Sequence, residues 1–151
     1  MVHTTILAVE KALGTSITIP LEMLSAANDI ARARKQRNKI IAIDITGPES
    51  GSIKLSGDLL IQCNKRLNEI TRTDLIFVPG IWGNPKAAVK RHPDLVTWLQ
   101  DQYCNGATIC SIVTGSYFLA EAGLLDEKAA TTHWRFFDQF ENLFPSVKLQ
   151  R

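Results

Sequence analysis

Four short runs of mostly aliphatic and β-branched residues recur along the chain, at positions 4–9, 39–46, 74–78 and 107–112. The segments that follow several of them carry apolar residues spaced as on one face of a helix, for example 21–30 and 93–99. Strands that alternate with helices through short connections build a parallel sheet with helices on both faces. The sequence therefore predicts an α/β domain of three layers around a mostly parallel sheet.

Two segments outside these runs also have a predicted structure. Ser16 or Thr18 is a candidate N-cap for the first helix, which would then have Pro20 in its first turn, a favoured early position. Residues 53–62 can form a small hairpin or extend the edge of the sheet, with a Gly-Asp pair inside.

The overall composition fits one globular domain. The chain has 151 residues, of which 45% are hydrophobic and 21% charged, and this length is enough for one sizeable core. Seventeen basic and fifteen acidic residues give a net charge of +2, too small a bias to indicate a nucleic-acid or membrane partner. Three cysteines and the absence of a signal-peptide pattern at the start lead us to expect a reducing, cytoplasmic location.

Five of the basic residues fall within the run RARKQRNK at 32–39. Such a run is similar to a nucleic-acid-binding arm. However, cations also suit the C-terminus of a helix and a solvated turn. We interpret the run in this second way from the sequence.

A ligand site is expected at one edge of the sheet. In parallel sheets, ligands bind beyond the carboxyl ends of the strands. The segments 13–16, 79–84 and 113–116 follow such ends, and 131–134 is a further candidate.

The turn after the run 107–112 is shaped like one that presents a nucleophile, but it carries none. A strand, a tight turn and a helix starting at Ser116 would aim backbone N–H groups outward, which favours an anion. Val113 occupies the turn and has no lone pair to offer. Cys110 lies three residues earlier on the strand, where we expect it to be buried in the core. The hydroxyls of Thr114 and Ser116 suit helix caps better than nucleophiles.

His133, in the sequence TTHW, is the one histidine with a functional context. It fits either a general base beside the turn or a hydrogen-bonded structural residue. No cluster of His, Cys and acidic residues has the spacing of metal ligands, and the glycines match neither a phosphate loop nor a dinucleotide fingerprint. We therefore expect no metal and no cofactor.

Three stretches together resemble a known family: IPLEMLSAAN, the strand end VPG, and TGSYFLAEAGLLDEKAATTHW. They are similar to the ThiJ/PfpI superfamily, which is class I glutamine amidotransferase-like and has a flavodoxin-like fold. More closely, they resemble the sensor domain that precedes an AraC-type helix-turn-helix in bacterial transcription regulators. The run LAEAGLLDEKAATTHW at 119–134 carries most of this likeness, which extends over nearly the whole chain.

The resemblance implies a role for each matching position. The family's elbow cysteine falls on Val113 and its acidic partner falls on Ser16, while its histidine is retained as His133. The backbone donors of its PGG-like turn fall on Gly80 and Ile81. Nucleophile and acid are thus both missing, so the resemblance implies a pocket that has lost its chemistry. Because strand, helix and glycine constrain the turn, we predict that Val113 keeps the positive φ of the nucleophile it replaces.

The resemblance favours a non-catalytic domain that senses a small molecule of unknown identity. It implies a homodimer, and it implies DNA binding only through a C-terminal domain that these 151 residues do not contain. It also leads us to expect a single domain without the last strand and helix of the sensor fold. Two alternatives are a hydrolase, glyoxalase or amidase of the ThiJ/PfpI type, and a dimerisation module without a ligand. The expected ligand-binding residues are Ser16, Gly80, Ile81, Trp82, Asn84, Val113, Thr114, His133 and Trp134.

Overall fold

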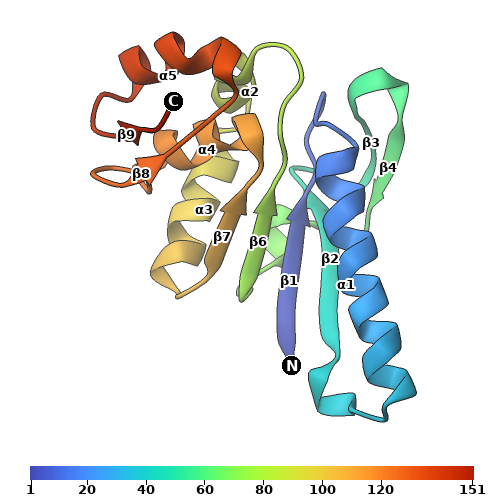
Figure 1. The fold of residues 1–151 in the computed structure, drawn as a ribbon. Helices are drawn as coiled ribbons and strands as arrows, with labels where there is room; N and C mark the ends of the chain where they lie inside the picture. Colours follow the sequence, from blue (N-terminus) through green and yellow to red (C-terminus); the bar gives the residue numbers. More distant parts are fainter.

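The computed structural model describes residues 1–151 and is built around one parallel sheet of five strands (Figure 1). The strands are β1 (Val2–Leu7), β2 (Ile41–Gly47), β5 (Lys65–Arg66), β6 (Leu75–Val78) and β7 (Thr108–Ser111), in the order β5-β2-β1-β6-β7. All neighbouring pairs in this sheet are parallel. Strand β1 is central, so its residues pair on both sides, and this explains why its second half is completely buried.

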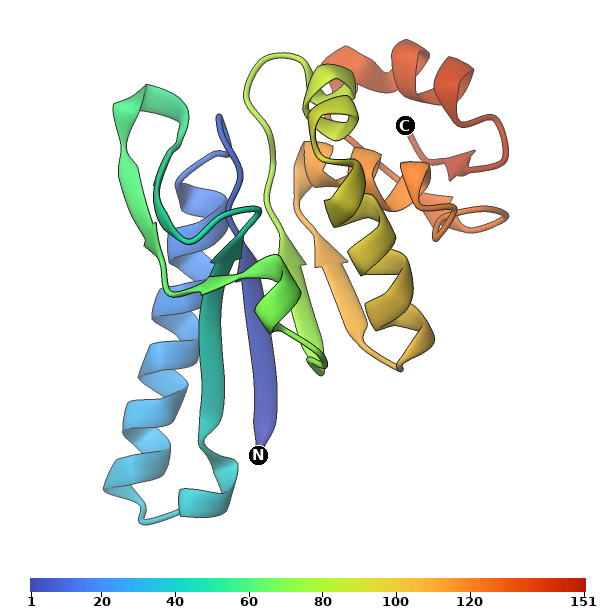
Figure 2. The ribbon, with the colours of Figure 1, turned by 180° about the vertical axis from the view of Figure 1, so that it is seen from behind.

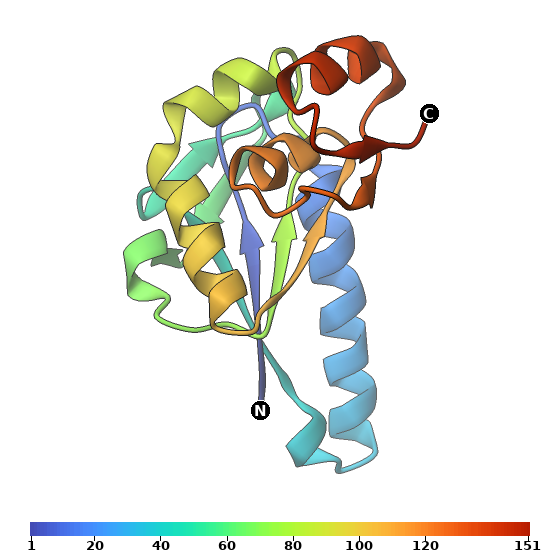
Figure 3. The ribbon, with the colours of Figure 1, turned by 90° about the vertical axis from the view of Figure 1, so that its left-hand side faces the viewer.

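Helices cover both faces of this sheet, as the alternating pattern predicts. The long helix α1 (Thr15–Ala33) lies on one face, while α3 (Pro93–Cys104) and α4 (Ser116–Glu121) lie on the other (Figures 2 and 3). Helix α2 (Pro85–Arg91) packs against α3 and α4, beyond the strand ends. Helix α5 (Phe137–Leu143) sits beyond the carboxyl ends of the strands. No helix has both the length and the apolar character needed to span a membrane.

Smaller elements fill the connections. The hairpin of β3 (Gly51–Lys54) and β4 (Leu60–Cys63) is antiparallel, and the Gly-Asp pair lies in its loop with positive φ at both residues. The predicted hairpin is therefore confirmed. Strands β8 (Ala129–Ala130) and β9 (Lys148–Leu149) form a separate parallel pair. Five short 3-10 turns complete the chain, at Arg37–Lys39, Ser56–Asp58, Leu67–Glu69, Val113–Gly115 and Trp134–Phe136.

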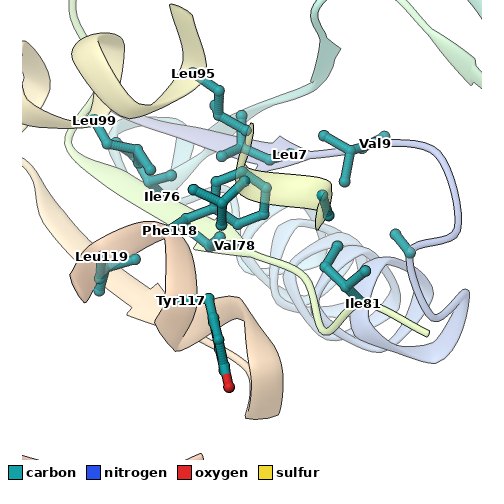
Figure 4. Close-up of a cluster of buried hydrophobic side chains, with 14 of the residues drawn as sticks. Leu7, Val9, Ile76, Val78, Ile81, Leu95, Leu99, Tyr117, Phe118 and Leu119 are labelled. Atoms are coloured by element: carbon teal, nitrogen blue, oxygen red, sulfur yellow. The ribbon is translucent and has the colours of Figure 1, made fainter. Parts of the chain in front are cut away.

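The main core lies between the sheet and helices α3 and α4 (Figure 4). Ile76 and Val78 of β6 are fully buried there, beside Leu99 of α3 and Phe118 of α4. Helix α4 is buried along almost its whole length, because α5 covers it on the side away from the sheet. Tyr117 makes that second contact: its ring packs 5.1 Å from the ring of Phe140 in α5.

A buried carboxylate on β2 links this strand to both of its neighbours, β1 and β5. Asp44 of β2 lies 2.7 Å from His3 Nε2 and 2.8 Å from Lys65 Nζ, and Asn64 donates a hydrogen bond to it at 3.0 Å. Burial alone would raise the pKa of Asp44. The hydrogen bond and charge of Lys65, with the smaller effects of His3 and Asn64, outweigh burial and hold this pKa below its usual value.

The start of helix α1 differs from the prediction. Its N-cap is Gly14, and no side chain caps it. Ser16 and Thr18 lie inside the helix, and Pro20 falls in the second turn rather than the first. The reason is that the loop before the helix is held by backbone bonds, with Leu13 N–H donating to Gly80 O at 2.8 Å, so the helix begins earlier than its capping residues suggest.

Cys110 was expected in the core, and this expectation is wrong: its side chain is exposed. Alternation along a strand does determine which face a residue points to. However, β7 is the last strand of the five-stranded sheet, and the face to which Cys110 points lies beyond the part that α1 packs against, which is β1, β2 and β6.

Candidate functional site

The turn at Val113 keeps the strained geometry of a nucleophile elbow. Val113 has φ = +50°, a left-handed conformation that β-branched residues very rarely adopt. Its side chain is 44% exposed, so it points away from the core. The predicted positive φ is confirmed.

The backbone around the turn explains this conformation. Ile112 N–H donates to Val78 O at 2.9 Å, which ties the turn to the end of β6. A Cβ atom on Gly115 would lie 2.6 Å from that same carbonyl oxygen, so only glycine fits where α4 begins. Ser116 donates its hydroxyl to Val113 O at 3.0 Å. The turn is thus held from both sides without any contribution from the side chain of Val113.

A second loop lies against the elbow and is fixed to it by Thr114. The Thr114 hydroxyl accepts a hydrogen bond from Ile81 N–H at 2.7 Å and donates one to Ile81 O at 3.0 Å. Thr114 is 2% exposed, so this pair of bonds is shielded from water. The Ile81 N–H that the resemblance implied as a free donor is therefore already occupied. The N–H of Thr114 itself takes no part in the hydrogen bonds of the turn.

Ser16 and Gly80 lie directly behind this contact. A Cβ atom on Gly80 would come within 3.2 Å of Ile112 O and 3.4 Å of Ser16 Oγ, which shows how closely the loop approaches both the elbow and helix α1. Ser16 is buried. The resemblance places the family's acidic residue at this position, and a serine hydroxyl cannot supply that acid–base function.

The elbow forms one wall of an open cavity of about 780 Å³. Seven of the nine predicted site residues line it: Ile81, Trp82, Asn84, Val113, Thr114, His133 and Trp134. The other two, Ser16 and Gly80, lie behind its wall. Of the remaining lining residues, Leu13 and Gly83 lie in the segments that the sequence predicts at the strand ends, whereas Arg135 and Phe136 were not expected. Arg135 directly follows the TTHW sequence, and this adjacency was the available signal.

His133 has a defined orientation in this cavity. Its Nδ1 accepts a hydrogen bond from Arg135 N–H at 3.2 Å, which caps the short turn Trp134–Phe136. A neutral His133 must then carry its proton on Nε2, leaving that atom as a donor. Its ring lies 5.3 Å from that of Trp134 and 6.1 Å from that of Phe136. His133 therefore caps the turn through Nδ1, and its Nε2–H remains available as a hydrogen-bond donor.

The cavity has the composition of a binding site. Two exposed tryptophans, Trp82 (65%) and Trp134 (72%), give it aromatic walls. Arg135 supplies a positive charge, and no Asp or Glu lines the cavity to neutralise it. The thiol of Cys110 is on the sheet and is not part of the lining. This arrangement can hold a ligand with polar or anionic groups, but it offers no nucleophile at the elbow.

Comparison with known proteins agrees with this geometry. The model of the DJ-1/PfpI family matches residues 6–146. The chain belongs to this family. The DJ-1/PfpI domain is the same family as the ThiJ/PfpI superfamily that the sequence resembles, so that resemblance is confirmed.

Its relatives include regulators as well as an enzyme. The chain is 32% identical over 126 residues to the HTH-type transcriptional regulator CdhR of Pseudomonas aeruginosa; the match covers 83% of this chain and 37% of CdhR. It is 34% identical over 70 residues to an isonitrile hydratase of Pseudomonas putida, covering 46% of this chain and 30% of that protein. The chain thus spans about a third of the length of these curated relatives.

Solved structures support the fold. The crystal structure of an AraC family transcriptional regulator from Pseudomonas putida superposes with a TM-score of 0.80 at 18% identity, over 99% of this chain and 76% of that one. At this level of identity the likeness establishes the fold, which is the flavodoxin-like fold of the DJ-1 superfamily.

Proposed function

We propose that this chain is a non-catalytic sensor domain of an AraC-type transcriptional regulator and that it binds a small metabolite in the cavity beside Val113. The observation that carries the proposal is an elbow with intact backbone geometry whose exposed side chain is an aliphatic valine. Regulators among the relatives support the same role, and sequence-specific DNA binding then belongs to a separate domain. The enzyme alternative is disfavoured because neither a nucleophile nor an acid stands at the elbow.

The cavity favours a small ligand with an anionic or strongly polar group. Arg135 is the only fully charged side chain in its lining, and the Thr114 N–H and His133 Nε2 are further donors. The two tryptophans provide flat apolar surfaces for the rest of the ligand. The identity of the metabolite is not specified by these features.

A thermal-shift screen of anionic and polar metabolites tests the proposal, because a ligand that binds only the folded state raises the melting temperature. For any metabolite that does so, we expect His133→Ala to reduce the shift. His133→Asn is the matched control, since asparagine is a good N-cap and can still accept the Arg135 N–H. Loss of the shift in both variants supports direct contact with the ring. Unchanged binding in His133→Ala would contradict the assigned site.

We also propose that the chain forms a homodimer through the outer face of α1. Ile19, Met23 and Ile30 are 53%, 69% and 54% exposed and recur at helical spacing along that face. An apolar stripe of this kind is typical of an interface. Analytical ultracentrifugation of the wild type and of Met23→Glu tests this proposal. The wild type should have the mass of a dimer, and the variant should already dissociate into monomers at protein concentrations where the wild type is still a dimer.

A further inference from the structure

The most strongly charged surface of the molecule lies far from the cavity, at the C-terminal end of α1. Residues 29–39 carry five cations and one carboxylate, a net charge of +4, so the other 140 residues together carry −2. We call this segment the basic tip; it comprises the last turn of α1 and the 3-10 turn Arg37–Lys39. In Figures 1 and 3 it projects beyond the end of the sheet, at the edge opposite the cavity.

The cations of the basic tip are free to meet a partner. All five side chains belong to exposed residues, and only Arg32 is in an ion pair, with Asp29 at 2.8 Å. The four without an ion pair are Arg34, Lys35, Arg37 and Lys39. Ion pairs within the chain therefore do not account for this concentration of charge, and the C-terminus of α1 favours cations only close to its last turn.

The basic tip is held in a fixed position. Asn28 is buried and makes two hydrogen bonds of 2.8 Å to Ile41, one to its carbonyl oxygen and one from its N–H. These bonds fasten the base of the tip to the start of β2. Lys35 adopts φ = +56°, which reverses the chain after α1, and its N–H donates to Arg32 O at 2.9 Å. A partner thus meets the cations on a folded scaffold, with less backbone to order on binding.

We propose that the basic tip binds the phosphate backbone of double-stranded DNA without sequence preference. From Arg34 to Lys39 the chain can extend over at most about 20 Å, which is less than one turn of the double helix at about 34 Å. Two of the four unpaired cations are arginines, which bind phosphate oxygens in a bidentate manner. Gln36 and Asn38, between the cations, add donors of the kind that contact phosphates.

An anionic membrane is the less suitable partner for this surface. Membrane-binding basic segments combine cations with large apolar side chains that insert between the lipids. The one large apolar side chain of the basic tip is Ile30, which belongs to the proposed dimer face of α1, and residues 32–39 contain no aliphatic residue larger than alanine and no aromatic one. The contact with DNA goes beyond the proposed function and does not depend on ligand binding in the cavity. It would add affinity to the specific binding of a separate domain.

Fluorescence anisotropy of a labelled 24-base-pair duplex of arbitrary sequence tests the inference with the 151-residue chain. If all four unpaired cations contact phosphates, the logarithm of the affinity should fall with the logarithm of salt concentration with a slope of about −3.6. This slope corresponds to a roughly 100-fold loss of affinity between 50 and 200 mM salt. Replacing all four by glutamine should abolish measurable binding at 50 mM salt.

A matched variant separates this surface from the overall charge. Arg72, Lys86, Lys90 and Arg91 are also exposed and without an ion pair, and their replacement by glutamine removes the same charge from other surfaces. We expect this control to retain the affinity and the salt slope of the wild type to within about twofold. Equal losses in both variants, or wild-type binding without salt dependence, would overturn the proposal. Tighter binding to vesicles with anionic lipid than to the duplex at the same salt would also overturn it.

Discussion

Val113→Gly tests whether the elbow stores backbone strain in the absence of catalysis. The valine sits at φ = +50°, and a non-glycine residue held in this region costs about 1–3 kcal/mol of stability. Glycine adopts the same conformation without a Cβ clash. The hydrogen bonds that hold the turn come from Ile112, Gly115 and Ser116, so the substitution leaves them in place.

The expected magnitude is a balance of three contributions. Relief of strain stabilises the folded state by about 2 kcal/mol. Glycine's greater freedom in the unfolded chain costs about 0.5–1 kcal/mol. Val113 is 44% exposed, so removing its half-buried side chain costs about a further 1 kcal/mol. We therefore expect Val113→Gly to change the free energy of unfolding by less than about 0.5 kcal/mol.

Val2→Gly is the matched control, because Val2 is 50% exposed and lies in strand β1 without a positive φ. It loses similar burial and gains no relief of strain, so it should destabilise the protein by about 1.5–2 kcal/mol. Urea denaturation followed by circular dichroism measures both variants. Val113→Ala should also destabilise, because it loses methyl groups and keeps the Cβ. If Val113→Gly costs as much as Val2→Gly, the turn is not strained and our explanation of its geometry is wrong.

Three further predictions concern individual side chains. Asp44→Asn should lower the free energy of unfolding at pH 7 by about 1–3 kcal/mol, since it breaks the contact with Lys65. The pKa of Asp44 in the folded state is below its usual value, so the stabilisation that Asp44 contributes is complete above about pH 5 and is lost as pH falls through the folded pKa. The free energies of unfolding of wild type and variant, measured by urea titration, should therefore converge in acid. A difference between them that does not change with pH would contradict this prediction. Thr114→Val should lower the free energy of unfolding by about 1–3 kcal/mol, because it leaves the buried Ile81 N–H without its acceptor. Thr114→Ser keeps the hydroxyl and should lower it by less than half as much. Equal losses in the two variants would show that packing matters more than the hydroxyl. Val113→Cys should give no turnover of glyoxals or amides above background, because no acidic side chain stands beside the elbow, and a measurable rate in that variant would revive the enzyme alternative.

Much of the fold could be predicted from the sequence because its signals are local. Each buried strand of the sheet reads as a run of β-branched and aliphatic residues, and the helix at Pro93 begins where the proline predicts. The short strand β5 has no such run, since it consists of Lys65 and Arg66 at the sheet edge. Its place is set by pairing with β2 rather than by its own residues.

Exposure and pocket composition were harder to predict because they depend on contacts between distant segments. The alternation of side chains along β7 shows that Cys110 and Ile109 point to opposite faces, but it does not tell how much of each face is covered. Likewise, Arg135 and Phe136 line the cavity only because the fold brings the segment after β8 close to the loop at 79–84. Apart from the adjacency of Arg135 to the TTHW sequence, nothing in the local sequence indicates this approach.

The elbow shows why a backbone geometry could be predicted although the side chain at position 113 does not determine it. Its conformation depends on a carbonyl of β6, on the glycine that lets α4 approach it, and on a serine hydroxyl bonded to the turn. None of these contacts involves the side chain at position 113, so that residue can be exchanged at the cost of strain alone. The Thr114 hydroxyl accepts the hydrogen bond of the Ile81 N–H, so this N–H is not available to a ligand. Neither the aliphatic side chain of Val113 nor the bond from Thr114 to Ile81 closes the cavity formed by the two loops. The domain thus presents a binding surface on a rigid scaffold, as the proposed sensor role requires.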